Sequence, residues 1–200
     1  MTEALACLRP TLAGDLFSGL TDMHRAVRSG FRLPNNVSDL EYVDLKQKAK
    51  IERSPLICAV GFGLSFGGKW FAGITRPDTK YTKQFNKWAD RFQKQQNIFL
   101  REDSVSFLSW REFARPGVTF YCDPPYVQTT NYATGVWNPE FLIQEAWAWK
   151  ALGARVFISE FSQLPGTSIV FSFTRNFPPL DGTQKATQQT ELLLELTPQA

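Results

Sequence analysis

Short apolar runs alternate with segments of helical periodicity in the first and last thirds of the chain, and this alternation constrains the fold most. The strand-like runs are residues 11–14, 97–100, 118–122, 155–161, 168–173 and 191–196. A helical pattern follows the first run and stops at Gly30, and Pro139 and Gly153 mark the start and end of another helix. Strands that alternate with helices are typical of an α/β fold. The last two runs lack an intervening helix, which predicts an antiparallel hairpin at the sheet's edge.

The middle of the chain interrupts this alternation, because residues 35–96 contain little strand-like sequence. We therefore expect residues 1–34 and 97–200 to form one α/β domain. Residues 35–96 are expected to form a lobe inserted in it, mainly helical and basic.

Helix signals divide this inserted lobe. Ser38 or Asp39 can cap a helix that runs to about Arg53, and Thr82 can cap the next helix. Apolar side chains recur along that second helix at Phe85, Trp88, Ala89 and Phe92, which predicts that this face is buried.

Composition excludes several classes of protein. Of the 200 residues, 43% are apolar and 20% are charged, which excludes wholesale disorder. No apolar run is long enough to span a membrane, and the first residues do not resemble a secretion signal. Three widely spaced cysteines and one histidine predict neither a disulfide framework nor a metal site. We expect a cytoplasmic protein in a reducing compartment.

The strand-like run 118–122 leads directly into Asp123, Pro124, Pro125 and Tyr126. Ligands of open α/β sheets bind beyond the carboxyl ends of strands. A carboxylate and a carbonyl fixed by the prolines can accept hydrogen bonds from one amino group, and the tyrosine ring offers a surface for a base. The alternative is a strand that ends at prolines, with the aspartate capping a turn and the tyrosine packed in the core.

The Asp123-Pro124-Pro125-Tyr126 sequence resembles the catalytic motif of the DNA N6-adenine methyltransferases, and the chain is similar to the Dam-like branch, especially phage-encoded enzymes. Three further stretches resemble motifs of that branch in the expected order: residues 61–71, 129–132 and 156–161. The similarity extends from about Leu12 to Leu196. It implies a Rossmann-like methyltransferase sheet.

The resemblance also implies a reaction and roles for single residues. The substrate is an adenine flipped out of double-stranded DNA, and the methyl donor is S-adenosylmethionine. Asp123 and the carbonyl of Pro124 accept hydrogen bonds from the N6 amino group, Tyr126 stacks on the adenine, and Tyr132 helps to hold it. Asp15 binds the ribose hydroxyls of the cofactor, Asp103 lies beside its adenine, and Asp123 adjoins the same site. Taken alone, Asp15 and Asp103 are ordinary turn or cap residues.

The chain departs from the family at its amino-terminal end. The family's phenylalanine- and glycine-containing loop and first strand have no counterpart, and residues 2–9 resemble the helix that follows the loop. The expected sheet is therefore N-terminally incomplete. A second polypeptide that supplies this segment, a start assigned too late, and a remnant with another role remain open.

The stretch from Lys69 to Lys94 contains seven basic and two acidic residues, a net charge of +5. Phosphate backbones attract such a stretch, so we expect it to bind DNA. The candidate contacts are Lys69, Trp70, Arg76 and Lys80, which lie outside the helix expected from Thr82.

Three functions follow from these patterns. The leading one is methylation of adenine N6 in double-stranded DNA, by a phage- or prophage-encoded enzyme in a bacterial cytoplasm. The second is a catalytically silent methyltransferase remnant that binds DNA or a protein. The third is a P-loop nucleotide site from Gly63 to Lys69, where Trp70 replaces the serine or threonine that holds magnesium.

Overall fold

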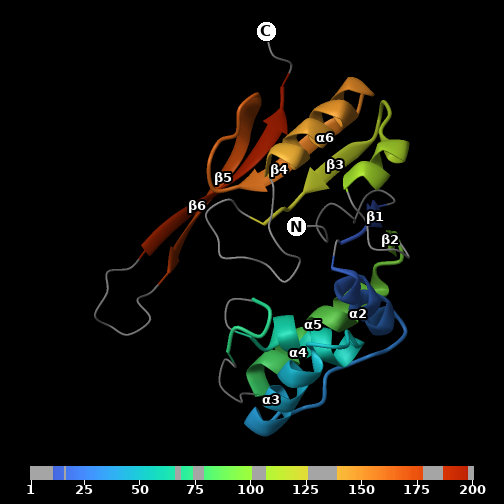
Figure 1. Ribbon diagram of the computed structural model, residues 1–200, viewed down its shortest axis with the longest axis vertical. Coiled ribbons are helices and arrows are strands. Elements are labelled where there is room, and N and C mark those ends of the chain that lie inside the picture. Colours follow the sequence, from blue (N-terminus) through green and yellow to red (C-terminus); the bar gives the residue numbers. More distant parts are fainter. Residues whose placement is uncertain are drawn as a thin grey trace. The chain divides into compact units, whose positions relative to one another are not determined.

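The computed structural model describes residues 11–15, 17–65, 69–73, 79–100, 107–125, 139–177 and 187–197 (Figure 1). The chain divides into two compact units, residues 1–105 and 106–200. We describe each unit by itself. The expected assignment of residues 1–34 and 97–200 to one domain stays a prediction.

In its described residues, the first unit combines four helices with a two-stranded parallel sheet. The elements are β1 (Thr11–Ala13), α2 (Ser18–Arg28), α3 (Asp39–Lys48), α4 (Pro55–Gly63), α5 (Thr79–Lys94) and β2 (Ile98–Leu100). Strand β1 pairs with β2, Thr11 lying opposite Ile98. The helical character expected for residues 35–96 is confirmed over the described part of that range.

Capping residues set the ends of the first unit's helices. Ser38 and Glu41 form a capping box at the start of α3, and the hydroxyl of Ser54 caps α4. Helix α3 ends at Lys48, so the expectation of a helix to Arg53 is wrong. Thr82 is not a cap either: α5 begins at Thr79, and the Thr82 hydroxyl donates to the carbonyl of Asn35.

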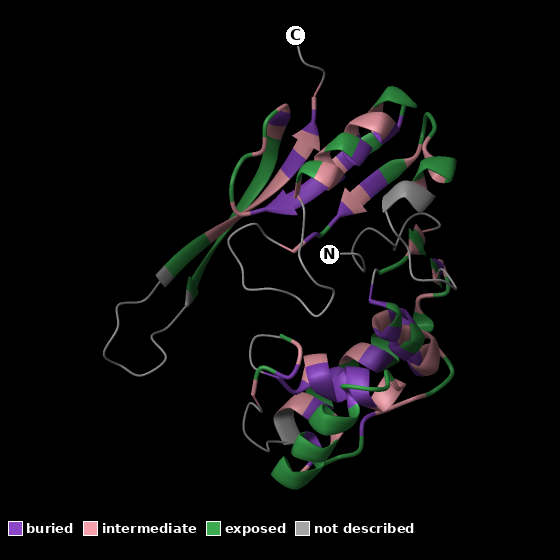
Figure 2. Cartoon of the chain, in the orientation of Figure 1, coloured by how far each residue is buried: buried purple, intermediate pink, exposed green. Residues whose placement is uncertain are grey.

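Helix α4 lies in the core of the first unit. Its residues from Ile57 to Gly61 are all buried (Figure 2). Gly61 is close to Trp70 and Phe71, since a Cβ placed there would lie 2.6 Å from a ring carbon of Trp70. A helix that is apolar on all sides is buried on all sides, which explains why this segment lacks helical periodicity.

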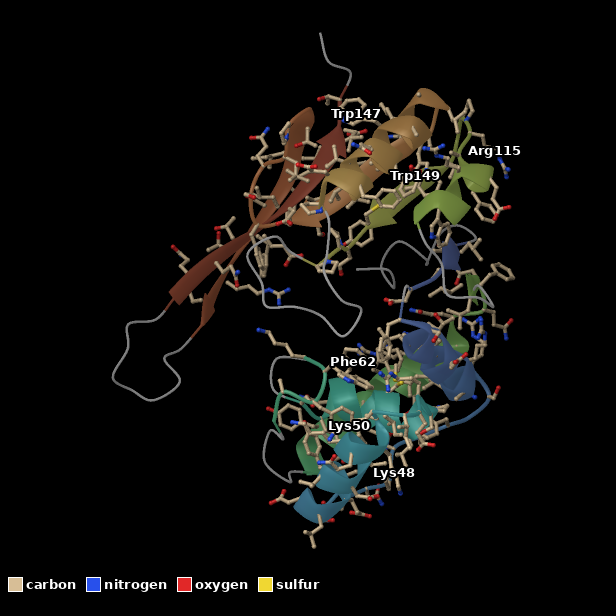
Figure 3. All side chains as sticks on the ribbon, in the orientation of Figure 1. Lys48, Lys50, Phe62, Arg115, Trp147 and Trp149 are labelled. Atoms are coloured by element: carbon tan, nitrogen blue, oxygen red, sulfur yellow. The ribbon has the colours of Figure 1, made fainter. Side chains whose placement is uncertain are left out.

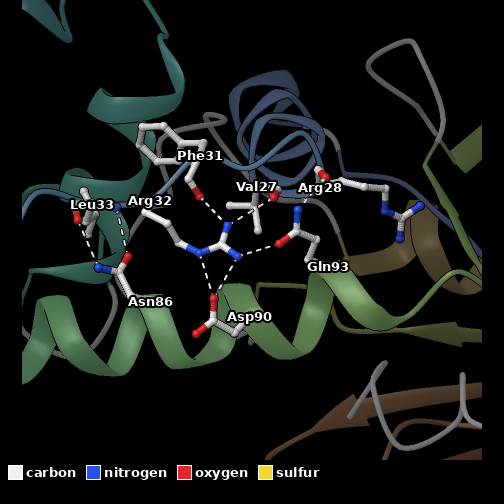
Figure 4. A network of polar contacts seen from close by, with 8 residues as sticks. All are labelled: Val27, Arg28, Phe31, Arg32, Leu33, Asn86, Asp90 and Gln93. Atoms are coloured by element: carbon white, nitrogen blue, oxygen red, sulfur yellow. Dashed lines mark hydrogen bonds and ion pairs between the residues drawn. The ribbon is translucent and has the colours of Figure 1, made fainter.

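A polar network fastens the turn after α2 to helix α5 (Figure 4). The Arg32 guanidinium donates to Asp90 at 2.9 Å and to Gln93 at 2.7 Å. The Asn86 side chain pairs with both backbone groups of Leu33. The neighbouring face of α5 carries Phe85, Ala89 and Phe92, and these side chains pack into the core, as expected.

The second unit contains a four-stranded mixed sheet. Its elements are the 3-10 helix η2 (Phe107–Phe113), β3 (Thr119–Cys122), α6 (Pro139–Ala151), β4 (Arg155–Glu160), β5 (Thr167–Phe177) and β6 (Thr187–Leu196). The strand order is β3-β4-β6-β5. Strands β3 and β4 are parallel, and β6 runs antiparallel to both of its neighbours. The expected hairpin at the sheet's edge is therefore confirmed.

Helix α6 covers one face of this sheet. Trp149 is fully buried, and its ring centroid lies 4.6 Å from that of Phe120 on β3 (Figure 3). Trp147 is partly buried against the same core. Arg111 of η2 makes a bidentate contact with the buried Glu145 of α6 at 2.7 and 2.8 Å. The α/β class expected from the sequence is confirmed, and the Rossmann-like methyltransferase fold stays a prediction.

Candidate functional site

The carboxyl end of β3 carries the candidate catalytic residues. Asp123 follows the last residue of the strand and is exposed, Pro124 is buried, and Pro125 is half-buried. Neither proline nitrogen carries a hydrogen, so the backbone beyond Asp123 offers carbonyls and no donors. Tyr126 and Tyr132 lie outside the described residues. A solvent-exposed carboxylate in this position can accept hydrogen bonds from a ligand.

A buried hydroxyl pair braces the ends of β3 and β4 next to Asp123. The Tyr121 hydroxyl and the Ser159 hydroxyl are 2.7 Å apart, and Ser159 is only 1% exposed. Burial, with a smaller contribution from the nearby Asp123 charge, raises the pKa of Tyr121 to about 12, while the hydrogen bond with Ser159 lowers it. Tyr121 is therefore neutral at physiological pH. The sequence gives no signal for this pair, because it depends on the register of two distant strands.

Cys122 precedes Asp123 but is unsuited to nucleophilic chemistry. Its thiol is buried, and burial together with the Asp123 charge raises its pKa to about 12. A thiol that stays protonated is a poor nucleophile. Cys122 and Cys58 are both free cysteines. Among the residues at this strand end, Asp123 is thus the reactive candidate.

Asp15, the candidate cofactor residue, follows β1 in the first unit. Its Oδ1 accepts a hydrogen bond from the backbone N–H of Phe17 at 2.7 Å, directly before α2. Desolvation by the surrounding protein raises the pKa of the Asp15 carboxyl, while the hydrogen bond from Phe17 and the charge of His24 lower it. Within the described part of the chain, Oδ2 accepts no hydrogen bond. This oxygen fits the role of acceptor for a ribose hydroxyl.

The other predicted cofactor residue, Asp103, lies outside the described residues. His24, the single histidine, is half-buried and packs edge-on against Trp88 and Phe92. Burial lowers its pKa, and its Nδ1 lies 2.6 Å from the carbonyl oxygen of Leu20. His24 is therefore held in the core of the first unit, and its ring has a packing role.

The candidate DNA contacts differ in how the structure places them. Lys69 is exposed, whereas Trp70 is half-buried against Phe17, Phe62 and Phe71. Trp70 thus has a packing role whether or not it also touches DNA. Arg76 lies outside the described residues. Lys80 is the second residue of α5, so the expectation that it lies outside that helix is wrong, and its side chain is not described. Four further exposed cations lie on α5: Lys83, Lys87, Arg91 and Lys94.

Two side chains of α3, the buried Tyr42 and the exposed Lys46, anchor the segments on either side of residues 66–68, and the sequence did not single them out for this role. The Tyr42 hydroxyl lies 2.7 Å from the Ser65 hydroxyl and accepts a hydrogen bond from Gly73 N–H at 3.3 Å. Lys46 Nζ donates to the carbonyl of Phe71 at 3.0 Å. Lys69 therefore sits on a segment that is fastened to α3.

The P-loop interpretation of Gly63–Lys69 is wrong on its structural context. A P-loop follows a β-strand and opens a helix. Here Gly63 is the last residue of helix α4. Because a helix precedes the glycine where a strand is required, the segment lacks the structural context of a P-loop.

Metal and membrane sites are absent from the described ranges. No group of three or more potential metal ligands occurs among the residues that the structure describes. In the same residues, no helix has the length and apolarity needed to cross a membrane.

The chain matches no protein-family model, and no curated protein matches it at a significant level.

Proposed function

We propose that the chain is the catalytic part of an S-adenosylmethionine-dependent DNA adenine N6-methyltransferase. The observation that carries the proposal is the exposed Asp123 carboxylate at the carboxyl end of β3, followed by two prolines. A carboxylate buried under packed side chains could not reach a nucleotide. The reaction is inferred from the resemblance of the motif, and the accessibility of Asp123 supports the proposal.

The proposed chemistry depends on where two hydrogen-bond acceptors lie relative to the N6 amino group of the adenine. The Asp123 carboxylate and the Pro124 carbonyl accept hydrogen bonds from the two N6 hydrogens and aim the nitrogen lone pair. When bound, S-adenosylmethionine supplies an electrophilic methyl group whose bond to sulfur breaks as nitrogen attacks it. The methylated nitrogen then releases one proton to the solvent that reaches the exposed Asp123. Asp15 Oδ2 would hold the ribose, and the Tyr121–Ser159 pair keeps the end of β3 in place beneath Asp123.

A methyl-transfer assay tests this function. Purified protein, with the product of any adjoining reading frame, is given radiolabelled S-adenosylmethionine and unmethylated double-stranded DNA. We expect labelled N6-methyladenine, and a loss of at least 100-fold in Asp123→Asn, which keeps the size and shape of the side chain. Asp44→Asn is the matched control, because Asp44 is a surface carboxylate paired with Lys48 at 2.8 Å. Full activity in Asp123→Asn contradicts the assignment.

DNA binding is tested separately. The exposed cations of the first unit predict binding whose affinity falls steeply with salt, by about 0.9 in log–log slope for each phosphate neutralised. Lys69→Ala and Lys83→Ala should each reduce that slope. Salt-dependent binding without binding of S-adenosylmethionine in calorimetry would favour the silent remnant instead.

A further inference from the structure

The hairpin formed by β5 and β6 extends beyond the rest of its sheet (Figure 1). Strand β4 pairs with β6 only from Leu192 to Glu195. Among the residues that the structure describes, 173–177 of β5 and 187–191 of β6 therefore pair only with each other. Two-stranded ribbons are marginally stable in water. Pairing with a further strand would therefore stabilise this part of the hairpin.

Strand β5 is also an edge strand whose exposed side chains are apolar. Among the described residues no strand pairs with its outer edge. Phe171 is 60% exposed and Phe173 is 50% exposed, while Ile169 and Val170 are exposed by 48% and 46%. Edge strands of folded proteins are normally protected by charges, prolines or covering segments. From Thr167 to Thr174, β5 carries no charge and no proline.

We propose that β5 pairs antiparallel with β5 of a second copy of this chain, on a twofold axis at Phe173. This register places Phe173 opposite its symmetry mate and Phe171 opposite Arg175 of the second copy. On the other face it places Ser172 opposite Thr174. Each copy carries the bulge between Ile169 and Phe171, so regular pairing ends at both ends of the symmetric ladder and covers residues 171–175. The dimer joins two four-stranded sheets into one continuous sheet.

The chemistry of the strand selects a second copy rather than another occupant. The Arg175 guanidinium already lies 5.4 Å from the centroid of the Phe173 ring and is paired with Glu191 at 3.7 Å. In the proposed register each Arg175 lies over a second aromatic ring, that of Phe171, and no like charges face each other. Serine and threonine hydroxyls face each other on the opposite side, where they can exchange hydrogen bonds. The strand is thus complementary to itself.

The available area predicts a weak dimer. The four apolar side chains offer on the order of 400 Å², since a covered aromatic residue buries roughly 150–250 Å². A standard interface buries about 800 Å² on each partner. We expect a dissociation constant of roughly 1–100 μM, because backbone hydrogen bonds have to supply the binding free energy that the small apolar area does not.

Sedimentation velocity of the full chain from about 1 to 200 μM tests the dimer. We expect the sedimentation coefficient to rise from the monomer to the dimer value, and Phe173→Glu to stay monomeric with an unchanged circular dichroism spectrum. Leu152→Glu is the matched control, because Leu152 is 50% exposed after α6 and lies outside β5. A monomer throughout this range, or a dimer that Phe173→Glu leaves intact, overturns the proposal.

The register is tested by cysteine pairs. Ser172→Cys with Thr174→Cys should give a disulfide-linked dimer on mild oxidation, because directly opposite Cα atoms lie within disulfide reach. Each single variant should cross-link much less, since its own symmetry mate is about 7–8 Å away on the diagonal. Equal cross-linking by a single variant overturns the register. Neither experiment depends on methyltransferase activity.

Discussion

The hydroxyl of Tyr121 on β3 and the hydroxyl of Ser159 on β4 lie 2.7 Å apart, and each residue is the next-to-last of its strand. Ser159 is buried, so its hydroxyl depends on protein groups for hydrogen bonding. The contact joins the strand that leads into Asp123 to its parallel neighbour. It therefore positions the backbone from which the candidate catalytic carboxylate projects.

Tyr121→Phe should destabilise the fold by about 1–2 kcal/mol, because it removes the partner of a buried hydroxyl and leaves the ring in place. Urea unfolding measures the change. The double variant Tyr121→Phe with Ser159→Ala is the control, since removing both hydroxyls should cost less than the sum of the single changes. If the methyltransferase proposal holds, kcat of Tyr121→Phe should fall more than KM rises. Purely additive stabilities would contradict a direct bond.

Raising the pH above 9 should lower the free energy of unfolding of this protein. Burial raises the pKa of Tyr121 and Cys122 to about 12 and that of Cys58 to about 11, above the ordinary values of 10.0 and 9.0. The folded state therefore holds these protons more tightly than the unfolded state does. The stabilisation is complete below pH 9 and is lost as the pH rises through 11 to 12.

Unfolding free energies measured from pH 8 to pH 11 check this expectation. Cys58→Ala should lower stability at pH 8 by removing a buried group, and should also flatten the decline above pH 9. Asp44→Asn, on the surface, serves as the control. An unchanged slope in Cys58→Ala would show that this thiol does not titrate in the unfolding transition.

Local signals in the sequence predicted the elements that depend on neighbours in the chain. Ser38 caps α3 as expected because its hydroxyl accepts from Glu41, three residues later. Gly153 ends α6 with a φ of 93°, a conformation that glycine adopts without strain. All six expected strands occur, because their apolar runs are short and bounded by turn residues.

Features that depend on tertiary contacts could not be predicted in this way. Thr82 looks like a cap, but its hydroxyl bonds to Asn35 in a distant turn, and the helix begins three residues earlier. Helix α3 stops at Lys48, where the backbone N–H groups of Lys50 and Ile51 donate to the carbonyls of Gln47 and Lys48 in a turn. Asp123 could be placed at a strand end from the pattern alone. Its support by Tyr121 and Ser159 required the strand register.

The Arg111–Glu145 contact predicts that the single variant Arg111→Ala is less stable than the double variant that also carries Glu145→Leu. Glu145 is 4% exposed and Arg111 is 51% exposed. Arg111→Ala should destabilise the second unit by roughly 2 kcal/mol, less than the 3–5 kcal/mol of a fully buried pair, because water reaches the arginine. Adding Glu145→Leu should recover most of the loss, since it removes the unpaired charge. Thermal unfolding of both variants measures this, and no recovery in the double variant would contradict the account.

Two glycines on α4 give a matched pair of substitutions. A Cβ at Gly61 would lie 2.6 Å from Trp70 and 2.7 Å from Phe71, whereas a Cβ at Gly63 would meet only Phe85, at 3.2 Å. Gly61→Ala should therefore cost about 1–3 kcal/mol through overpacking. Gly63→Ala should lie within about 0.5 kcal/mol of wild type, because alanine favours the helix and offsets a small shift of the Phe85 ring. Urea unfolding and tryptophan fluorescence report stability and the displacement of Trp70. Equal effects of the two changes would mean that Gly61 is retained for a reason other than its contact with Trp70 and Phe71.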